Sequence, residues 1–329
     1  MKKLNQFVVI VLAIVLSCGI FSAVSAEDSM KKIGILQFAP HASLDNCYKG
    51  ILEGLKEAGF EDGKNASIEF VNGQGEMETN QLAAADFVTK KFDIIIAIAT
   101  PSATAAYAAA KDAGIPVVFS AVSDPVAAGL AASLDDPETG ATGTSDSLNL
   151  DGQLKMIRAF LPDAKKIGVL YTTSEANSLS QIKSLQEIAP KYGFEIDAKG
   201  ITDASEVASG AASLVADKVD CLNNLTDNNV VNNFAVVTAA TDPAGIPAFG
   251  SEEEQVKKYG CVASETLDYV ALGVTTGKMA ADVLNGADIK KMAVSIVKDS
   301  EPVYSSVNLA KFKLTVPADY ASARDVAEK

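Results

Sequence analysis

The sequence has no tryptophan, one histidine (His41) and four cysteines among 329 residues. No two cysteines form a CxxC pair, and the motifs GxSxG, GxxxxGK[ST] and HExxH are absent. These absences argue against a disulfide framework, a zinc site, a P-loop and a conventional serine hydrolase. Residues 72–77 begin with a GxG pattern but lack its third glycine, which makes a weak dinucleotide signal. We therefore expect no catalytic residues, no metal and no cofactor.

Basic residues are also scarce, because 28 Lys and Arg face 42 Asp and Glu, for a net charge of −14. Residues 1–26 have the pattern of a secretory signal: "MKK", an apolar core, and "SAVSA" before acidic residues. Cleavage after Ala26 would leave 26 basic and 42 acidic residues, a net charge of −16. Such a surface repels nucleic acid and anionic lipid, so we expect neither as a partner. The signal pattern leads us to expect an exported protein, in the periplasm or at the cell surface, and we expect it to be a monomer.

The N-terminal segment could also be processed as a lipoprotein signal. The stretch "VLSC", which ends at Cys18, resembles a lipoprotein signal, and processing there would anchor the protein through a lipid on Cys18. Uncleaved, the same apolar run would be a membrane anchor. The other three cysteines, Cys47, Cys221 and Cys261, are expected to be buried free thiols. A strand over residues 246–250 should separate Cys221 from Cys261.

A short internal repeat indicates the organisation of the chain. "KKIGILQ" begins at Lys31 and "KKIGVLY" at Lys165, and each opens a strand, a polar loop and an amphipathic helix that ends in Gly-Phe. Strands and helices then alternate in each half of the chain, which predicts two doubly wound α/β lobes. The first is expected to have four strands, and the second five in the usual order 2-1-3-4-5. We expect the first lobe to comprise residues 31–147 plus about 267–288, and the second 148–266 plus about 289–329. A helix is predicted over 269–286 and a last strand over 302–309.

The loops at the carboxyl ends of the predicted strands are rich in hydroxyl, amide and acidic side chains, where open α/β sheets bind ligands. Together they suit a zwitterion. Thr100 and Ser102 at a helix N-terminus could bind a carboxylate, with Ser120 and Ala121 at the next strand end. Across the cleft, the candidates for an ammonium group are Asp227, Glu252 and Glu175. For Thr100, Ser102 and Ser178, a purely structural role as a helix N-cap is as good an explanation as ligand contact. For Asp227 the structural alternative is an Asx-turn.

Several of these stretches carry a family resemblance. "KKIGILQFAPHASLD", "IAIATPSATAA", "VFSAVSDPVAAGL", "ATGTSD", "IGVLYTTSEANS", "TDNNVV" and "TLDYVALG" resemble the substrate-binding proteins of bacterial ABC importers, and within them the subgroup associated with aromatic amino acids. The resemblance spans about residues 31–316. It implies a type I periplasmic binding protein with two lobes, a crossover hinge and a ligand bound by lobe closure. The implied partners are the ligand, a membrane permease and its ATPase.

The resemblance also implies which residues line the cleft. They are Ser43, Leu44, Thr100, Ser102, Ser120 and Ala121 in the first lobe, and Ser174, Glu175, Asn177, Ser178, Asp227 and Asn228 in the second. The stretch "GSEEE" departs from the family, in which Asp more often follows the serine, so the role of Glu252 is open. Phe38, Tyr48, Phe119 and Tyr171 could stack on an aromatic ligand, although aromatic residues near strand ends are more often core.

Other functions stay open at this stage. A binding protein of this kind could take a branched-chain amino acid, a nucleoside or a sugar instead. A ligand-sensing ectodomain is a second alternative. An enzyme on a similar fold, such as a racemase, would need a pair of acid/base residues facing each other across the cleft.

Overall fold

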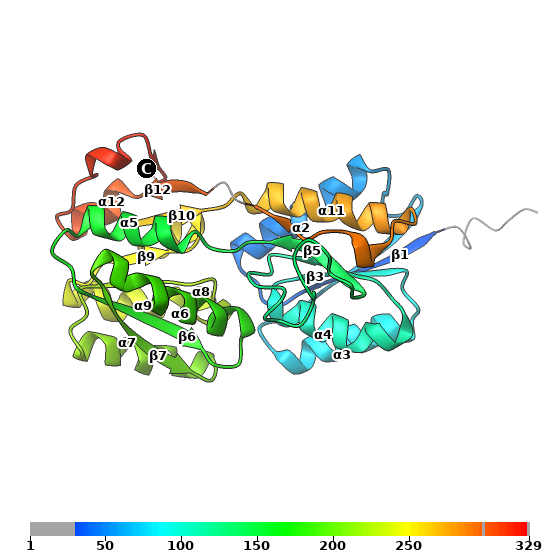
Figure 1. The fold of residues 1–329 in the computed structure, drawn as a ribbon, viewed down its shortest axis with the longest axis horizontal. Coiled ribbons are helices and arrows are strands. Elements are labelled where there is room, and N and C mark those ends of the chain that lie inside the picture. Colours follow the sequence, from blue (N-terminus) through cyan, green and yellow to red (C-terminus); the bar gives the residue numbers. More distant parts are fainter. Residues whose placement is uncertain (1–29, 298–299, 328–329) are drawn as a thin grey trace, which may run out of the picture.

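The computed structural model describes residues 30–297 and 300–327. It consists of two lobes side by side, each with one sheet between layers of helices (Figure 1). The expected signal sequence and Cys18 lie outside the described residues.

The first lobe contains a six-stranded parallel sheet in the order β2-β1-β3-β4-β5-β11. Its first four strands are the four predicted from the sequence, whereas β5 and β11 were not predicted as strands. Helices cover both faces, so both faces are apolar; all five residues of β3 are fully buried. The strands are β1 (Lys31–Gln37), β2 (Ala66–Asn72), β3 (Ile94–Ile98), β4 (Val117–Ser120), β5 (Ala141–Ser145) and β11 (Ser295–Ile296); the helices are α2 (Ala42–Glu57), α3 (Met77–Thr89), α4 (Thr100–Ala110) and α11 (Tyr269–Leu284).

The second lobe repeats this plan in a seven-stranded sheet, ordered β13-β12-β10-β9-β8-β6-β7, in which only β12 runs antiparallel to its neighbour β10. Its strands are β6 (Lys166–Thr172), β7 (Glu195–Ile201), β8 (Cys221–Asn223), β9 (Ala248–Gly250), β10 (Ala263–Thr266), β12 (Glu301–Tyr304) and β13 (Arg324–Asp325). Its helices are α5 (Leu150–Phe160), α6 (Ala176–Ile188), α7 (Val207–Ala216), α8 (Asn228–Asn232), α9 (Phe234–Thr241), α10 (Glu253–Lys258) and α12 (Ser306–Lys311).

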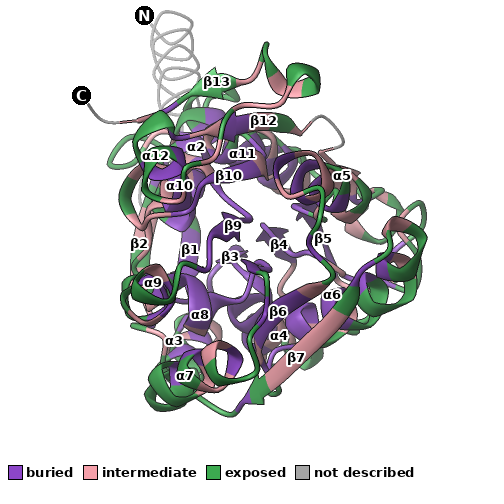
Figure 2. Cartoon of the chain, turned by 90° about the vertical axis from the view of Figure 1, so that its left-hand side faces the viewer, coloured by how far each residue is buried: buried purple, intermediate pink, exposed green. Residues whose placement is uncertain are grey.

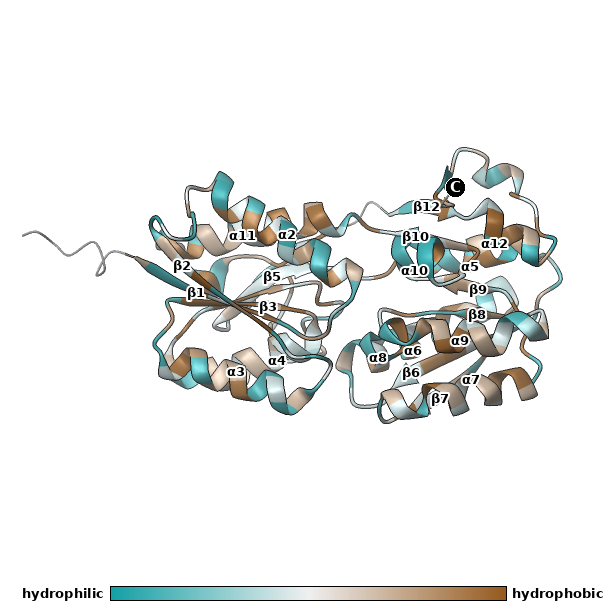
Figure 3. Ribbon diagram, turned by 180° about the vertical axis from the view of Figure 1, so that it is seen from behind, coloured by the Kyte–Doolittle hydropathy of each residue, from teal (hydrophilic) through white to brown (hydrophobic). Residues whose placement is uncertain are grey.

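Burial follows these layers. In Figure 2 the central strands are purple, while the exposed residues lie on the outer helices and loops. Figure 3 shows the same division as hydropathy, with brown strands in the interior and teal patches on the helices. Cys47, Cys221 and Cys261 are buried and free, and β9 separates the strand of Cys221 from β10, as expected.

Two helices of the first lobe lie unusually close together. Each carries a GxxxG pattern, Gly50 and Gly54 in α2, and Gly273 and Gly277 in α11. A Cβ atom on Gly273 would lie 2.2 Å from the backbone oxygen of Cys47, and one on Gly50 would lie 2.1 Å from that of Val270. Only glycine permits this contact, which holds the N-termini of α2 and α11 beside each other.

The chain passes between the sheets at residues 146–149, at 267–268 and between β11 and β12. The pairing of Ser295 with Thr144 and of Ile296 with Ser145 puts β11 in the first sheet. The predicted boundary near residue 289 is therefore wrong in that detail, because a two-residue strand gives almost no sequence signal. The strand expected over 302–309 ends at Tyr304, where the Ser305 side chain accepts from the Asn308 N–H and begins α12.

Candidate functional site

The carboxyl ends of the two sheets face each other across a small cavity of about 10 Å³, because side chains of the two lobes nearly meet there. Hydroxyl contacts join the lobes around it: Ser43 Oγ donates to Glu252 Oε2 (2.6 Å), and Ser123 Oγ lies 2.8 Å from Thr226 Oγ1. The lining residues are His41, Leu44, Ala99, Thr100, Ala121, Ser123, Asp146, Asn177, Thr226, Asn228, Val231, Glu252 and Tyr269.

Backbone geometry shapes the wall from the first lobe. Ala99, after β3, has φ = 77°, and Ala121, after β4, has φ = 54°. Left-handed conformations are costly for residues with a Cβ and gather at functional sites. The Ala99 N–H donates to the Ser120 carbonyl (2.9 Å), which ties the two turns together. The turns bring the small side chains of Ala99, Thr100 and Ala121 to the wall of the cavity.

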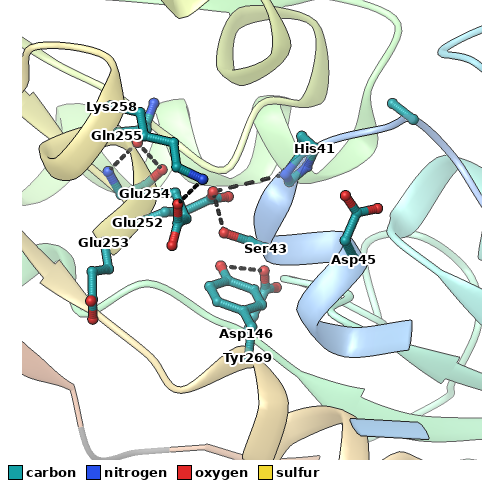
Figure 4. A network of polar contacts seen from close by, with 12 residues as sticks. His41, Ser43, Asp45, Asp146, Glu252, Glu253, Glu254, Gln255, Lys258 and Tyr269 are labelled. Atoms are coloured by element: carbon teal, nitrogen blue, oxygen red, sulfur yellow. Dashed lines mark hydrogen bonds and ion pairs between the residues drawn. The ribbon is translucent and has the colours of Figure 1, made fainter. Parts of the chain in front are cut away.

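Two buried carboxylates lie on the cavity, one from each side of the cleft (Figure 4). Asp146 follows β5 and accepts from Ser123 Oγ (2.9 Å) and from the Tyr269 hydroxyl (3.2 Å). Glu252 follows β9 and is 3% exposed. Burial raises the pKa of Asp146 to about 6 and that of Glu252 to about 7, and the charge of Glu252 contributes to the rise at Asp146. Negative charge here is costly, so a positive ligand group would be stabilised.

His41 precedes α2 and lines the same cavity, and its side chain is 7% exposed. Its Nδ1 is 4.0 Å from Glu252 Oε2 and has no hydrogen-bond partner. Desolvation lowers the pKa of His41 to about 4, although the nearby charge of Asp45 acts in the opposite direction. The imidazole is therefore neutral at pH 7.

Asp227, predicted to hold an ammonium group, does not line the cavity. Its carboxylate is fully buried and accepts from Thr172 Oγ1 (2.8 Å), Ser178 Oγ (2.7 Å), the Val230 N–H (2.9 Å) and the Thr172 N–H. Burial raises the pKa of Asp227. All four donors belong to the second lobe, so Asp227 organises the loop before α8.

Glu175 has a similar supporting position. Its Oε2 accepts from the side-chain amides of Asn177 (3.1 Å) and Asn228 (2.6 Å), both of which line the cavity. Burial, followed by the nearby charge of Asp227, raises the pKa of Glu175. The Asn177 amide nitrogen also donates to the Thr226 carbonyl (2.8 Å), while its Oδ1 has no partner. Glu175 thus orients two amides toward the cavity.

The other predicted residues divide into two groups. Leu44, Thr100, Ala121, Asn177, Asn228 and Glu252 line the cavity, and Ser43 contacts Glu252. The remaining four bond elsewhere: Ser102 to Asn80 (2.6 Å), Ser120 to Thr276 (3.0 Å), Ser178 to Asp227, and the exposed Ser174 to the Thr202 carbonyl (3.4 Å).

Sequence reasoning missed five polar or aromatic residues of the cavity: His41, Ser123, Asp146, Thr226 and Tyr269. Asp146 and Tyr269 lie where the chain crosses between lobes, and "ATGTSD" and "TLDY" contain them among the stretches that carried the resemblance. Those stretches could have identified both residues. Phe38, Tyr48, Phe119 and Tyr171 do not line the cavity; Tyr48 packs on Phe70 at a ring distance of 4.2 Å.

A larger open groove of about 340 Å³ adjoins the cavity at Tyr269 and is bordered by α10 and β13. Two of its charged side chains are paired within the second lobe, since Arg324 donates to both oxygens of Glu253 (3.0 and 2.6 Å). In residues 30–297 and 300–327, no cluster of three or more His, Cys, Asp or Glu side chains could hold a metal ion. Among the same residues, no helix combines the length and apolar character that crossing a bilayer requires.

These features define the class of the protein, which is a two-lobed binding protein with a polar cavity enclosed at the lobe interface. The family comparison is specific. Residues 32–322 match the family described as "ABC transporter substrate binding protein", and the chain belongs to that family. A protein of Clostridioides difficile (strain R20291) named "Tyrosine-binding protein" is 42% identical over 279 residues, covering 85% of this chain and 80% of that protein.

Solved structures agree on the fold. A Streptococcus pneumoniae ABC domain in complex with L-Trp has a TM-score of 0.87 at 32% identity, and a ligand-free, open substrate-binding protein from Clostridium difficile has 0.69 at 40%. Both matches cover 91% of this chain and 100% of the other. The TM-score is higher for the L-Trp complex, although its sequence is less similar to this chain than that of the open protein. The lobes here are therefore arranged more like those of the L-Trp complex. A leucine-binding protein from Thermotoga maritima, at 13% identity and a TM-score of 0.61, shares the fold.

Proposed function

We propose that this protein is the extracytoplasmic receptor of an ABC importer, that it binds one small amino acid between its lobes, and that it performs no chemistry on it. The protein would act as an exported monomer, free or anchored through Cys18, and deliver its ligand to a permease with a cytoplasmic ATPase. Residues 1–26 have the composition of a secretory signal, and the family membership supports the transport role.

The observation that carries the ligand class is the pair of buried carboxylates, Asp146 and Glu252, on an enclosed cavity. Buried charge is stabilised by a charge of opposite sign, and an α-ammonium group supplies one. Thr100 at the start of α4, an eleven-residue helix, is our candidate for the ligand carboxylate. Asp146 thus replaces Asp227 as the partner of Glu252 in the ammonium site.

An aromatic side chain is the preferred choice for the ligand. Two relatives support it, one named for tyrosine and one solved with L-Trp. Tyr269 lines the cavity and is itself aromatic, and Leu44 and Val231 add apolar surface from the two lobes. Offset or edge-on ring contacts contribute about 0.5–1.5 kcal/mol beyond area burial. We therefore propose Trp, Tyr or Phe as the ligand.

A thermal-shift screen of the mature protein, unfolded to strip ligand and refolded, tests this function. The panel comprises the common amino acids, nucleosides and sugars. A ligand at 100 times its dissociation constant should stabilise the protein by about 2.7 kcal/mol. We expect the largest response from an aromatic amino acid, recovered unchanged and with unchanged chirality. A response to a nucleoside or sugar alone would overturn the amino acid assignment, and altered ligand would overturn the receptor assignment.

A further inference from the structure

The cavity gathers acidic groups from both lobes against few compensating charges. Glu252 approaches from the second lobe and contacts Ser43 and His41 at the start of α2, while Asp146 lies at the end of β5 in the first lobe. Closing the lobes therefore removes two carboxylates from water together. Burying ionised carboxylates without a compensating charge is costly, and such groups take up protons instead.

The groups that face Glu252 do not remove this cost. His41, the residue before α2, contributes a neutral imidazole; α2 contributes the buried thiol of Cys47, and α11 contributes the Tyr269 phenol. Burial holds the pKa values of Cys47 and Tyr269 well above their usual range, so both stay neutral. Ser43 is the hydrogen-bond donor to Glu252.

Within the second lobe, Glu254 adds negative charge near Glu252 but is itself paired with Lys258 (2.8 Å) and Lys257 (3.8 Å). Cys261, packed behind the site, is buried and neutral, because burial holds the pKa of its thiol well above the usual range. Asp45, near His41, is exposed to solvent. The groups facing Asp146 are Ser123, Tyr269, Cys47 and Glu252.

We propose that closure of the two lobes takes up a proton, held by Glu252 and Asp146 on the closed cavity, and that the ammonium group of the ligand takes the place of that proton. A proton and an ammonium group then compete for one position. The ligand-free protein opens at neutral and alkaline pH and closes on acidification. The competition part rests on the proposed function; the proton uptake does not.

The sign follows from the shifted groups. Closure raises both carboxylate pKa values above those of solvated carboxyl groups, so protonation stabilises the closed state as the pH falls. In the closed form the pKa of Glu252 is about 7, against an ordinary 4.5. His41 opposes part of this effect, because the same burial lowers its pKa to about 4, so that closure releases the proton that an open imidazole would hold near pH 5. Between pH 8 and pH 5, the ratio of closed to open molecules should therefore rise on the order of tenfold. Ligand affinity should fall below about pH 6, because the ligand must then displace a bound proton.

The first experiment uses small-angle X-ray scattering on the ligand-stripped mature protein between pH 8 and pH 5. We expect the radius of gyration to fall on acidification. Glu252→Gln and Asp146→Asn, neutral at every pH, should shift the protein toward the compact form already at pH 8. The matched control is Glu253→Gln. Glu253 is the next residue in the chain, and its pKa is lowered to about 2, chiefly by its hydrogen bonds with Arg324. It is therefore ionised throughout this pH range, and the Glu253→Gln substitution should leave the pH-dependent transition unchanged.

A radius of gyration that stays constant from pH 8 to pH 5 in the unmodified protein would overturn the proposal, as would the same pH response in Glu252→Gln. Calorimetry with the amino acid found in the screen gives the second measurement. Affinity that weakens from pH 7 to pH 5 supports competition, while unchanged affinity refutes it. If no amino acid binds at any pH, the proposed function fails, and the scattering result still decides whether closure takes up a proton.

Discussion

The two lobes share a fold plan but build their cavity walls in different ways. The first lobe uses backbone: turns at Ala99 and Ala121 with positive φ, and two helices in glycine-mediated contact. The second lobe uses side chains, because the buried carboxylates of Asp227 and Glu175 bind surrounding N–H and O–H groups. A polar residue in a strand-end loop can therefore support the cavity wall instead of lining the cavity, as Asp227 does.

The largest effect should come from the backbone contact of the first lobe. Helix propensity alone would make Gly273→Ala stabilising by about 1 kcal/mol. The added Cβ would meet the Cys47 carbonyl, so we expect a loss of about 3 kcal/mol in the free energy of unfolding instead. Urea denaturation followed by circular dichroism measures it.

The control is Gly140→Ala, whose added Cβ would have its nearest neighbour at 3.8 Å, in the ring of Tyr107. It should change stability by less than about 0.5 kcal/mol. Equal stabilities of the two variants would mean that α2 and α11 are not in contact at Gly273. The claim that the first lobe builds its wall from close backbone contacts would then fail.

The second-lobe network should respond almost as strongly. Asp227→Ala leaves four donors without their acceptor, so we expect a loss of about 3 kcal/mol in the free energy of unfolding.

Asp146→Asn should have the opposite pattern of effects. We expect the free energy of unfolding to be retained, and the affinity for the amino acid to fall about 10- to 100-fold, because the ammonium group loses a charged partner. Denaturation and calorimetry on both variants separate a supporting carboxylate from one that binds. If the Asp227→Ala protein were as stable as the unmodified protein but bound the amino acid more weakly, Asp227 would contact the ammonium group, as the sequence predicted.

The smallest effects distinguish residues that the sequence treated alike. Thr100 lines the cavity, whereas Ser174 is exposed and bonds only to a carbonyl of its own lobe. Thr100→Ala should weaken binding about 3- to 10-fold, the effect of one hydrogen bond. Ser174→Ala should bind as the unmodified protein does. Isothermal titration of both variants decides, and a larger loss at Ser174 would contradict the placement of the cavity.

Much of the fold could be predicted because it depends on local patterns. Buried runs such as "DIIIAIA", the repeat at Lys31 and Lys165, and polar strand-end loops identify a doubly wound lobe twice. The short pieces were harder. Two residues of β11 carry no periodic signal, and Ser305 reads equally as a strand residue or a helix cap.

The candidate site was predictable only in part. The strand-end rule found the loops, and with them Thr100, Ala121 and Glu252, whereas Asn177 was implied only by the family resemblance. It could not tell which side chain of a loop turns toward the cavity, since Asp227 and Asn228 are adjacent and only Asn228 lines it. His41 is the single histidine of the sequence, but nothing near it in the sequence indicated a contact. The residue beside it in the structure, Glu252, comes from the other lobe.

The sequence by itself determined the two-lobe α/β plan and the loops that form the site, because hydrophobic period and turn residues act over a few positions. Only the tertiary structure decided which carboxylates are satisfied within one lobe and which meet across the cleft. That distinction depends on contacts between residues as far apart as Ser43 and Glu252, and on the burial of Glu252 in the assembled structure. Charge and burial of this kind belong to the assembled cavity and to no single stretch of the chain.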